Sequence, residues 1–249
     1  MTFNNHTAII TGAAKGIGAA TAKLFFEAGA NIVLLDVSED TSGIDDERWL
    51  FIHCDVSKNK EVENAMQQAQ IKFSNIHFLI NNAGIQRYGN VTNTTEEEWD
   101  LVMNVNVKSM YLCAKYAIPL MQNKGVVINV SSVQAFVSQQ NVAAYTTAKT
   151  ALLGFTRSIA VDYAPRIRCV AVCPGTIDTP MLRDAIALSP NPDEVMQECI
   201  DMHPVHRIGT PEEVAELILF LCSDKAAFIT GQAFRIDGGL GITIAGSKR

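Results

Sequence analysis

The chain has 249 residues, of which 48% are hydrophobic and 18% are charged, and its formal net charge at pH 7 is −6. This composition is typical of one globular domain, residues 1–249, and an acidic balance without a long basic run argues against a nucleic-acid partner. No apolar stretch reaches the roughly 20 residues that a transmembrane helix needs, and residues 1–6 lack a signal-peptide pattern, so we expect a cytoplasmic protein with no membrane partner.

Short apolar runs alternate with stretches of helical periodicity along the whole chain. The predicted strands cover residues 7–11, 31–35, 51–54, 78–81, 126–130, 167–172 and 233–236. The predicted helices cover residues 16–28, 57–73, 95–121 and 143–163, and a last one begins at 210. This alternation predicts an α/β fold: a single-domain, Rossmann-type doubly wound sheet of about seven parallel strands with helices on both faces.

Several residues mark the expected helix ends. Ser57 and Thr95 are placed to cap helices, and the three glutamates after Thr95 suit the positive end of a helix dipole. Pro119 is expected to bend or interrupt its helix. Pro211 suits the first turn of the last predicted helix.

The stretch from about 175 to 207 is the least regular part of the chain because prolines interrupt it. A long insertion between the sixth and seventh strands is expected to form a substrate loop. The six cysteines are scattered among apolar neighbours and lack the spacing of a zinc site. We therefore expect reduced thiols and no metal.

A glycine-rich turn joins the first predicted strand to the first predicted helix, with the spacing Gly-x-x-x-Gly-x-Gly. Glycines there permit positive φ angles and the close approach of a ligand, and the helix N-terminus offers free N–H groups to a diphosphate. The turn therefore favours nucleotide binding. The contacts are expected from Gly12, Lys15, Gly16, Ile17 and Gly18.

Acidic residues follow or end the second and third predicted strands. A carboxylate at Asp36 can accept hydrogen bonds from both hydroxyls of an adenosine ribose and would repel a 2′-phosphate, which favours NAD over NADP. Lys15 is a cation and would favour NADP, but Asp36 is the closer determinant of cofactor choice. The alternative for Asp36 is an aspartate that only caps the next turn. Asp55, with Val56 after it, either meets the adenine edge or caps the following helix.

Small and polar residues follow the next three strands in the same way. The segments are Asn82-Ala83-Gly84 after the fourth strand, Ser132 after the fifth and Pro174-Gly175 after the sixth. The carboxyl ends of parallel strands meet at one edge of the sheet, and open α/β sheets bind ligands there. We expect these segments to line one cleft, although plain turns are the alternative.

Tyr145 and Lys149 are four residues apart in a predicted helix and therefore share one face of it. An ammonium group near a phenol favours the phenolate and lowers its pKa from the usual value near ~10. The pair is suited to proton transfer in carbonyl or alcohol chemistry. A tyrosine and a lysine at this spacing are also common on ordinary helix surfaces.

Taken together, these motifs resemble the short-chain dehydrogenase/reductase (SDR) family from Thr11 to Gly239. The motifs are Thr11-Gly-x-x-x-Gly-x-Gly18, Asn81-Asn-Ala-Gly84, Val105-Asn106-Val107, Ser132, Tyr145-x-x-x-Lys149, Pro174-Gly175 and Ile236-Asp-Gly-Gly239. The resemblance implies further cofactor contacts from Ile177 and Thr179.

The resemblance also implies a role for each residue of the catalytic group. Tyr145 would be the general acid/base, and Lys149 would hold the nicotinamide ribose and lower the pKa of Tyr145. Ser132 would orient the substrate oxygen. Asn106, rather than the nearby Asn104, would hold a water in the proton relay.

The implied function is an NAD-dependent oxidoreductase that interconverts a secondary alcohol and a ketone by hydride transfer. An NADPH-dependent ketone or 3-oxoacyl reductase of the same family is an alternative. A non-catalytic NAD-sensing protein would be expected to lose Tyr145 or Lys149. An S-adenosylmethionine-dependent methyltransferase would not need both of these residues together with Ser132.

Residues 103–111 and 173–180 are similar to the branch of the family that includes hydroxybutyrate and sugar-acid dehydrogenases. That branch implies arginines or glutamines against a substrate carboxylate. Val142 stands where some members carry arginine, which argues against hydroxybutyrate, so a short hydroxy acid, a sugar derivative and a cyclic alcohol remain open. The substrate candidates are Arg87, Gln134 and Arg183, followed by Gln140, His203 and Arg207.

The resemblance further implies a homotetramer built through the helices over 95–121 and 143–163 and the C-terminal strand. The tail over 241–246 is apolar enough to pack in a subunit contact, but it could equally be a frayed end.

Overall fold

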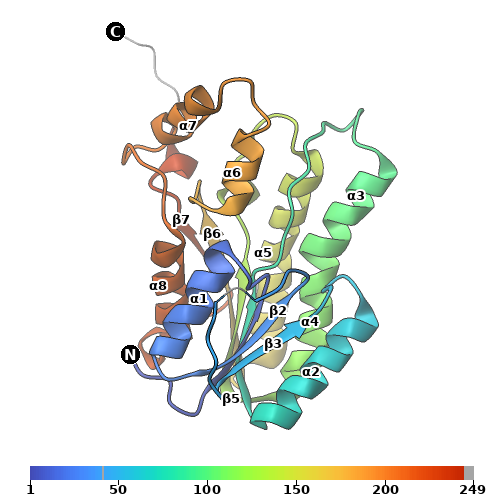
Figure 1. Ribbon diagram of the computed structural model, residues 1–249, viewed down its shortest axis with the longest axis vertical. Helices are drawn as coiled ribbons and strands as arrows, with labels where there is room; N and C mark the ends of the chain where they lie inside the picture. Colours follow the sequence, from blue (N-terminus) through green and yellow to red (C-terminus); the bar gives the residue numbers. More distant parts are fainter. Residues whose placement is uncertain (41, 244–249) are drawn as a thin grey trace.

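The computed structural model describes residues 1–40 and 42–243, which form one sheet of seven parallel strands with helices on both faces (Figure 1). The order across the sheet is β3-β2-β1-β4-β5-β6-β7, so the chain reverses its direction of winding between β1 and β4. The strands are β1 (Thr7–Thr11), β2 (Asn31–Asp36), β3 (Trp49–His53), β4 (Ile76–Asn81), β5 (Met121–Val130), β6 (Ile167–Pro174) and β7 (Ala233–Ile236). The fold class predicted from the alternation is confirmed.

Helices bury both faces of the sheet. The helices of the described residues are α1 (Gly16–Glu27), α2 (Asn59–Phe73), α3 (Glu96–Met103), α4 (Ser109–Ala117), α5 (Ala143–Tyr163), α6 (Pro180–Ile186), α7 (Pro192–Asp201) and α8 (Pro211–Cys222). Of these, α6 and α7 lie together at one end of the molecule rather than on a face of the sheet. On one face, Phe25 of α1 and Ile218 of α8 pack in the same cluster as Ile10. On the other, Met66 of α2 packs in the same cluster as Ile9. Neighbouring residues of β1 thus serve opposite cores, because strand side chains alternate, and this explains its unbroken apolar sequence.

The helix expected over 95–121 is interrupted earlier than Pro119. After α3, residues Asn104–Lys108 form a π-helical turn, and α4 follows it. The 3₁₀ turn Ile118–Leu120 then carries Pro119 and ends the helix, and β5 begins at Met121. The widened turn is a tertiary feature, since the sequence around it has no breaker before Pro119.

The expected caps have different outcomes. Thr95 caps α3, because its hydroxyl oxygen accepts a hydrogen bond from the N–H of Glu98 at 3.2 Å. Ser57 does not cap α2: its hydroxyl donates to the carboxylate of Asp55 at 2.7 Å, and α2 begins two residues later, at Asn59.

The stretch over 175–207 is more regular than expected, because it contains α6 and α7. Pro180 and Pro192 each stand in the first turn of their helix. A backbone N–H at that position has no partner within the helix, so its absence in proline costs no hydrogen bond. Figure 1 shows both helices together at the top of the view, on the opposite end of the molecule from the N-terminus.

Three sequence expectations concern membrane-spanning helices, the cysteines with a possible metal site, and the C-terminal tail. In the described parts of the chain, no helix is long and apolar enough to cross a membrane. All six cysteines are free thiols, and residues 1–40 and 42–243 contain no cluster of side chains that could hold a metal ion. The last part of the predicted tail contact, residues 244–246, lies outside the described residues.

Candidate active site

A cleft of about 960 Å³ runs along the carboxyl edge of the sheet. Its wall includes Asp55 after β3, Asp36 at the end of β2, Gly12 after β1, Gly84 after β4 and Ser132 after β5. Because these strands are neighbours in that order, residues from the two halves of the chain meet in one continuous site. The switch between β1 and β4 lies at its centre, where open α/β sheets bind ligands.

The glycine turn is held against the loop that follows β4. Gly12 has a φ of +62°, and a Cβ added there would lie 2.8 Å from the Cα of Ala83. The side-chain amide of Asn82 donates to the carbonyl oxygens of Thr11 at 3.0 Å and of Gly12 at 2.9 Å. These contacts leave room only for glycine at position 12 and bring the two loops together at the cleft.

Gly18 lies behind the cleft wall rather than in it. It is buried, and a Cβ there would overlap the Gly12 carbonyl oxygen and contact the Asn82 amide. Its lack of a side chain lets α1 pack closely on the turn. Gly18 thus has a packing role in this structure, and the cofactor contact predicted for it stays a prediction.

The N-terminus of α1 is available to an anion. Lys15 occupies the cap position without a side-chain hydrogen bond to the helix, and the first turn contains no acidic residue. The orphan N–H groups and the positive end of the helix dipole therefore remain for a ligand. Gly16 and Ile17 line the cleft beside them, so this part of the wall fits a diphosphate.

Asp36 fixes the turns on both sides of its strand end. One carboxylate oxygen accepts from the N–H of Ala14 at 2.8 Å and the other from the N–H of Ser38 at 2.9 Å. Each oxygen keeps a further lone pair, so both remain able to accept a ribose hydroxyl. Asp55 accepts the N–H of Ser57 at 2.9 Å and also lines the cleft, which leaves both of its predicted roles possible.

Tyr145 and Lys149 lie one turn apart on α5 and both line the cleft. The Lys149 side chain is buried, and its ammonium donates to the carbonyl oxygen of Val130 at 2.9 Å. The Lys149 nitrogen is 5.5 Å from the centre of the Tyr145 ring. Ser131 donates its hydroxyl to the Lys149 carbonyl at 2.7 Å, so the end of β5 holds this part of α5 in place.

The pKa values of this pair depend mainly on burial. Burial raises the pKa of Tyr145 to about 12, and the Ser132 side chain acts in the opposite direction. Burial also lowers the pKa of Lys149 to about 8. The expected lowering of the Tyr145 pKa by Lys149 is therefore not found, because desolvation of the phenol is the larger effect and the ammonium is hydrogen-bonded to Val130.

Ser132 follows β5 and is oriented by its own loop. Its hydroxyl oxygen accepts a hydrogen bond from the N–H of Gln134 at 3.1 Å. The hydroxyl hydrogen is left to donate to another group. Ser132 is thus arranged to donate to an oxygen placed between it and Tyr145.

Asn106 stands on the π-helical turn and is fully buried. Its amide nitrogen donates to the carbonyl oxygens of Ile85 and Val102, both at 2.9 Å, and its amide oxygen accepts from the N–H of Ile85 at 3.2 Å. A Cβ on Gly84 would lie 2.7 Å from the Asn106 oxygen and 3.3 Å from the Lys149 nitrogen. Asn106 therefore reaches the region of Lys149 from behind Gly84, with one lone pair of its oxygen unused.

Most of the predicted site residues are brought together in this cleft. Besides the residues already described, its wall contains Val56, Asn82, Ala83, Pro174, Gly175, Ile177 and Thr179 from the cofactor prediction, and Arg87 and Gln134 from the substrate prediction. Arg183 does not line the cleft, because its guanidinium forms two hydrogen bonds with the Asp178 carboxylate at 2.8 and 2.9 Å. Its predicted substrate contact stays a prediction.

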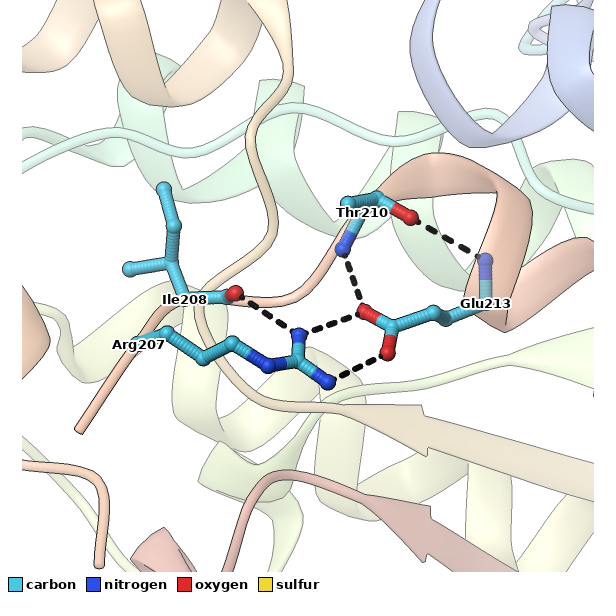
Figure 2. Close-up of polar contacts among 4 residues, drawn as sticks. All are labelled: Arg207, Ile208, Thr210 and Glu213. Atoms are coloured by element: carbon cyan, nitrogen blue, oxygen red, sulfur yellow. Dashed lines mark hydrogen bonds and ion pairs between the residues drawn. The ribbon is translucent and has the colours of Figure 1, made fainter. Parts of the chain in front are cut away.

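The remaining substrate candidates also lie outside the cleft. His203 is buried, with one ring nitrogen 2.7 Å from the Cys199 carbonyl and the other accepting the N–H of Thr176 at 3.2 Å. Arg207 is paired with Glu213 at the start of α8, as Figure 2 shows. Gln140 does not contribute to the cleft wall.

Sequence reasoning missed several residues of the cleft wall, among them Gln86, Tyr88, Glu198 and Cys199. The first two follow the Asn-Ala-Gly segment directly, so their place after β4 was a usable signal. The other two lie on α7, and no pattern in the sequence indicates that α7 covers the cleft.

Comparisons with known proteins agree with this arrangement. Residues 12–241 match the family model described as "Enoyl-(Acyl carrier protein) reductase". An uncharacterized oxidoreductase of Thermotoga maritima is 40% identical, over 96% of this chain and 98% of its own length. Many further curated proteins match as well.

Solved structures extend the likeness to three dimensions. The ligand-free aldohexose dehydrogenase of Thermoplasma acidophilum is 38% identical and superposes with a TM-score of 0.93, covering 99% of this chain and 98% of the other. A 3-ketoacyl-(acyl-carrier-protein) reductase from Brucella melitensis, complexed with NADH, is 32% identical with a TM-score of 0.86, covering 96% and 99%.

Proposed function

Because the chain belongs to the short-chain dehydrogenase/reductase family and is thus an oxidoreductase acting on CH–OH groups, we propose that it interconverts a secondary alcohol and a ketone with NAD. Tyr145 is the general acid/base of this proposal. The observation that carries it is that Ser132, Tyr145 and Lys149 line one cleft beside Gly84, with the buried Asn106 directly behind Gly84. Neither a nucleotide sensor nor a methyltransferase needs that group.

The cleft wall fits a dinucleotide in several independent ways. The Gly12 turn and the free N-terminus of α1 suit the diphosphate, and Asp36 suits the adenosine ribose. The carboxylate supports NAD over NADP, because it would repel a 2′-phosphate. Lys149 is placed to hold the nicotinamide ribose, and the cofactor, when bound, supplies the hydride acceptor.

The chain's own residues then handle the substrate oxygen and its proton. Ser132 donates its hydroxyl hydrogen to that oxygen, and the Tyr145 oxygen takes the proton in oxidation or returns it in reduction. The raised pKa of Tyr145 keeps the phenol neutral near pH 7 and suits it to proton donation. Asn106 fixes the loop at Ile85 and offers its remaining lone pair to a water near Lys149.

Tyr145→Phe tests this assignment directly. The variant should lose turnover of secondary alcohols by at least roughly 100-fold, because it lacks the acid/base group, while its affinity for NAD stays near that of the wild type. Initial rates are followed by the absorbance of reduced cofactor, with NAD and NADP side by side, and affinity by tryptophan quenching. Full activity in the variant would overturn the role of Tyr145.

A 3-oxoacyl reductase that uses NADPH is the second candidate. The likeness to the ketoacyl reductase, which was solved with NADH, favours this reaction but not this cofactor. The same side-by-side assay separates the two. A clear preference for NADPH, with reduction of a 3-oxoacyl thioester exceeding oxidation of every alcohol, would select this candidate. A preference for NAD would exclude it, because Asp36 then acts as the ribose acceptor.

A further inference from the structure

The loop after β6, residues 175–179, and the helix α7 line the same cleft, and the side chain of His203 joins them. Resting on the proposed function, in which NAD is the cofactor, we propose that His203 is a positioning residue: it transmits NAD binding from this loop to α7 and so holds α7 over the substrate. His203 stands two residues after α7 and does not line the cleft itself. Its two hydrogen bonds, its burial and the weak attachment of α7 carry the proposal.

The loop over 175–179 forms part of the cofactor side of the cleft. Its residues in the cleft wall are Gly175, Thr176, Ile177 and Thr179. At its far end the loop reaches the glycine turn, since a Cβ added to Gly16 would lie 3.3 Å from the Cγ2 atom of Thr179. A diphosphate at the N-terminus of α1 would therefore lie beside this loop. Binding of the cofactor is thus expected to fix the loop in place.

The helix α7 is only weakly attached to the rest of the protein by its own side chains. It contributes Val195, Glu198 and Cys199 to the cleft wall, but none of its residues is fully buried. Among the described residues, the hydrogen bonds that its side chains form stay within the helix and its cap residue. Segments with few buried contacts open at a low free-energy cost. The position of α7 therefore depends on how its ends are attached.

His203 attaches the C-terminal end of α7 to the loop. The Thr176 N–H donates to Nε2 of the imidazole at 3.2 Å, so the proton of the neutral ring is on Nδ1, which donates it to the Cys199 carbonyl oxygen at 2.7 Å. This carbonyl lies in the last turn of α7. In a continued helix its partner would be the His203 N–H, but that group donates to the Ile200 carbonyl at 3.1 Å. One side chain thus satisfies a backbone group of the helix and another of the loop.

The imidazole of His203 is fixed by the chain on both sides of it. Only 1% of His203 is exposed. A Cβ on Gly175 would lie 3.0 Å from its Nε2 atom, and a Cβ on Gly238 would lie 3.3 Å from its Cδ2 atom. The ring therefore fills the space between the chain after β6 and the chain after β7, and a rotated ring would lose both hydrogen bonds. A change in the position of the loop is thus passed on to α7.

Hydrogen exchange followed by mass spectrometry tests this link in the full chain, with NAD as the only ligand. In the wild type we expect saturating NAD to slow exchange at residues 12–18, at residues 175–179 and in α7, the last by roughly fivefold, the effect of one hydrogen bond. Slower exchange at 12–18 and 175–179 without a change in α7 overturns the proposal and leaves NAD binding intact. No change at 12–18 overturns the proposed cofactor and this proposal with it.

His203→Asn and His203→Gln each keep one half of the link. The Asn amide takes the place of Nδ1 and can still donate to Cys199, whereas the longer Gln side chain takes the place of Nε2 and can still accept from Thr176. In both variants NAD should still slow exchange at residues 12–18, which also shows that the variants are folded. The effect of NAD on α7 should be lost in both, because the link needs both bonds. An effect on α7 at the wild-type level in both variants would show that NAD reaches α7 without His203, and overturns the proposal.

The same two variants should differ in their affinity for NAD, which a merely structural role of His203 would not produce. His203→Asn releases the loop, so its Kd for NAD, measured by tryptophan quenching, should rise roughly fivefold. His203→Gln keeps the bond to the loop, so its Kd should stay within about twofold of the wild-type value. The same Kd in both variants would contradict the proposed division of roles between the two ring nitrogens and overturn the proposal.

His206→Asn is the matched control. His206 belongs to the same connection between α7 and α8 and is exposed, and among the described residues its side chain forms no hydrogen bond. Its φ of +53° is one that asparagine tolerates. This variant should keep the effect of NAD on α7 and the wild-type Kd. Loss of the effect on α7 in His206→Asn as well would show that any change in this connection releases α7, and would overturn the specific role of the His203 imidazole.

Discussion

At the scale of single residues, the proton chemistry of this site depends on two opposing effects. Burial raises the pKa of Tyr145, whereas the hydrogen bond with the Ser132 side chain lowers it. Lys149 is buried beside Tyr145, with its own pKa lowered to about 8. Its charge, and with it the stabilisation of a phenolate, therefore weakens as the pH rises through that value.

Lys149→Met should move the pH dependence of alcohol oxidation to higher pH. Oxidation needs the deprotonated phenol, which the charged ammonium favours, and because the pKa of Lys149 is about 8 the variant should lose kcat/KM mainly below that pH. We expect a displacement of about one unit or more, measured as kcat/KM for oxidation at saturating NAD. Lys149→Arg keeps the positive charge, so its pH profile should be displaced less than that of Lys149→Met. A Lys149→Met profile of unchanged shape and position would contradict this account.

At the scale of elements, the start of α8 shows how a capping box and an ion pair from the preceding loop combine. Thr210 and Glu213 form a reciprocal capping box, in which each side chain accepts the other's backbone N–H. Arg207 adds two charge-assisted bonds to the Glu213 carboxylate, at 2.6 and 2.8 Å (Figure 2). The hydrogen bonds from Arg207 are the main reason that the pKa of Glu213 is lowered to about 2.

Glu213→Gln should lower the free energy of unfolding at neutral pH by about 1 kcal/mol, a value kept small because both side chains are largely exposed to solvent. The folded-state pKa of Glu213 lies below its ordinary value of 4.5, so its contribution is fully present above pH 4.5 and is lost as the pH falls toward about 2. The difference between wild type and variant, measured by denaturant unfolding, should therefore shrink below pH 4.5.

Glu212→Gln is the matched control for this prediction. Glu212 stands in the same first turn of α8 and is exposed, and none of the ion pairs among the described residues includes it. Its substitution changes the charge near the helix dipole without breaking the Arg207 contact. Equal destabilisation by both variants would show that the dipole, and not the pair with Arg207, matters at this site.

At the scale of the whole molecule, α5 carries a feature that the single chain does not explain. Gly154 is exposed in the interior of this 21-residue helix, where glycine costs about 1 kcal/mol relative to alanine. The nearest atom to a Cβ added there is a guanidinium nitrogen of Arg157, at 4.0 Å. Close approach of a second subunit would account for the glycine, in keeping with the homotetramer that the family resemblance implies.

Gly154→Arg should therefore disrupt the assembly. We expect light scattering after size-exclusion chromatography to show a tetramer for the wild type and smaller species for the variant, because the arginine side chain blocks the approach of another helix. Gln67→Arg, a change of similar size on the exposed face of α2, should leave the assembly intact. A monomeric wild type would refute the tetramer.

Sequence patterns predicted the fold well because its elements follow local periodicity. The bounds of α5 and β7 agree with those expected, as do the cap at Thr95 and the place of Pro211 in the first turn of α8. The π-helical turn at Asn104–Lys108 and the helices within 175–207 were missed. The first has no breaker residue to indicate it, and in the second, prolines that begin helices were interpreted as interruptions.

The sequence by itself determined the order of strands and helices, the glycine turn after β1, and the placing of Tyr145 and Lys149 on one helix face, because each depends on residues within one or two turns of each other. Only the tertiary structure decided which side chains share the cleft. The Val130 carbonyl accepts from the Lys149 ammonium, the Ile85 carbonyl accepts from the Asn106 amide, and the Thr146 hydroxyl donates to Gln134. The physical reason is that these side chains respond to the partners, charges and burial they meet once the strand ends are assembled, which no local pattern in the sequence specifies.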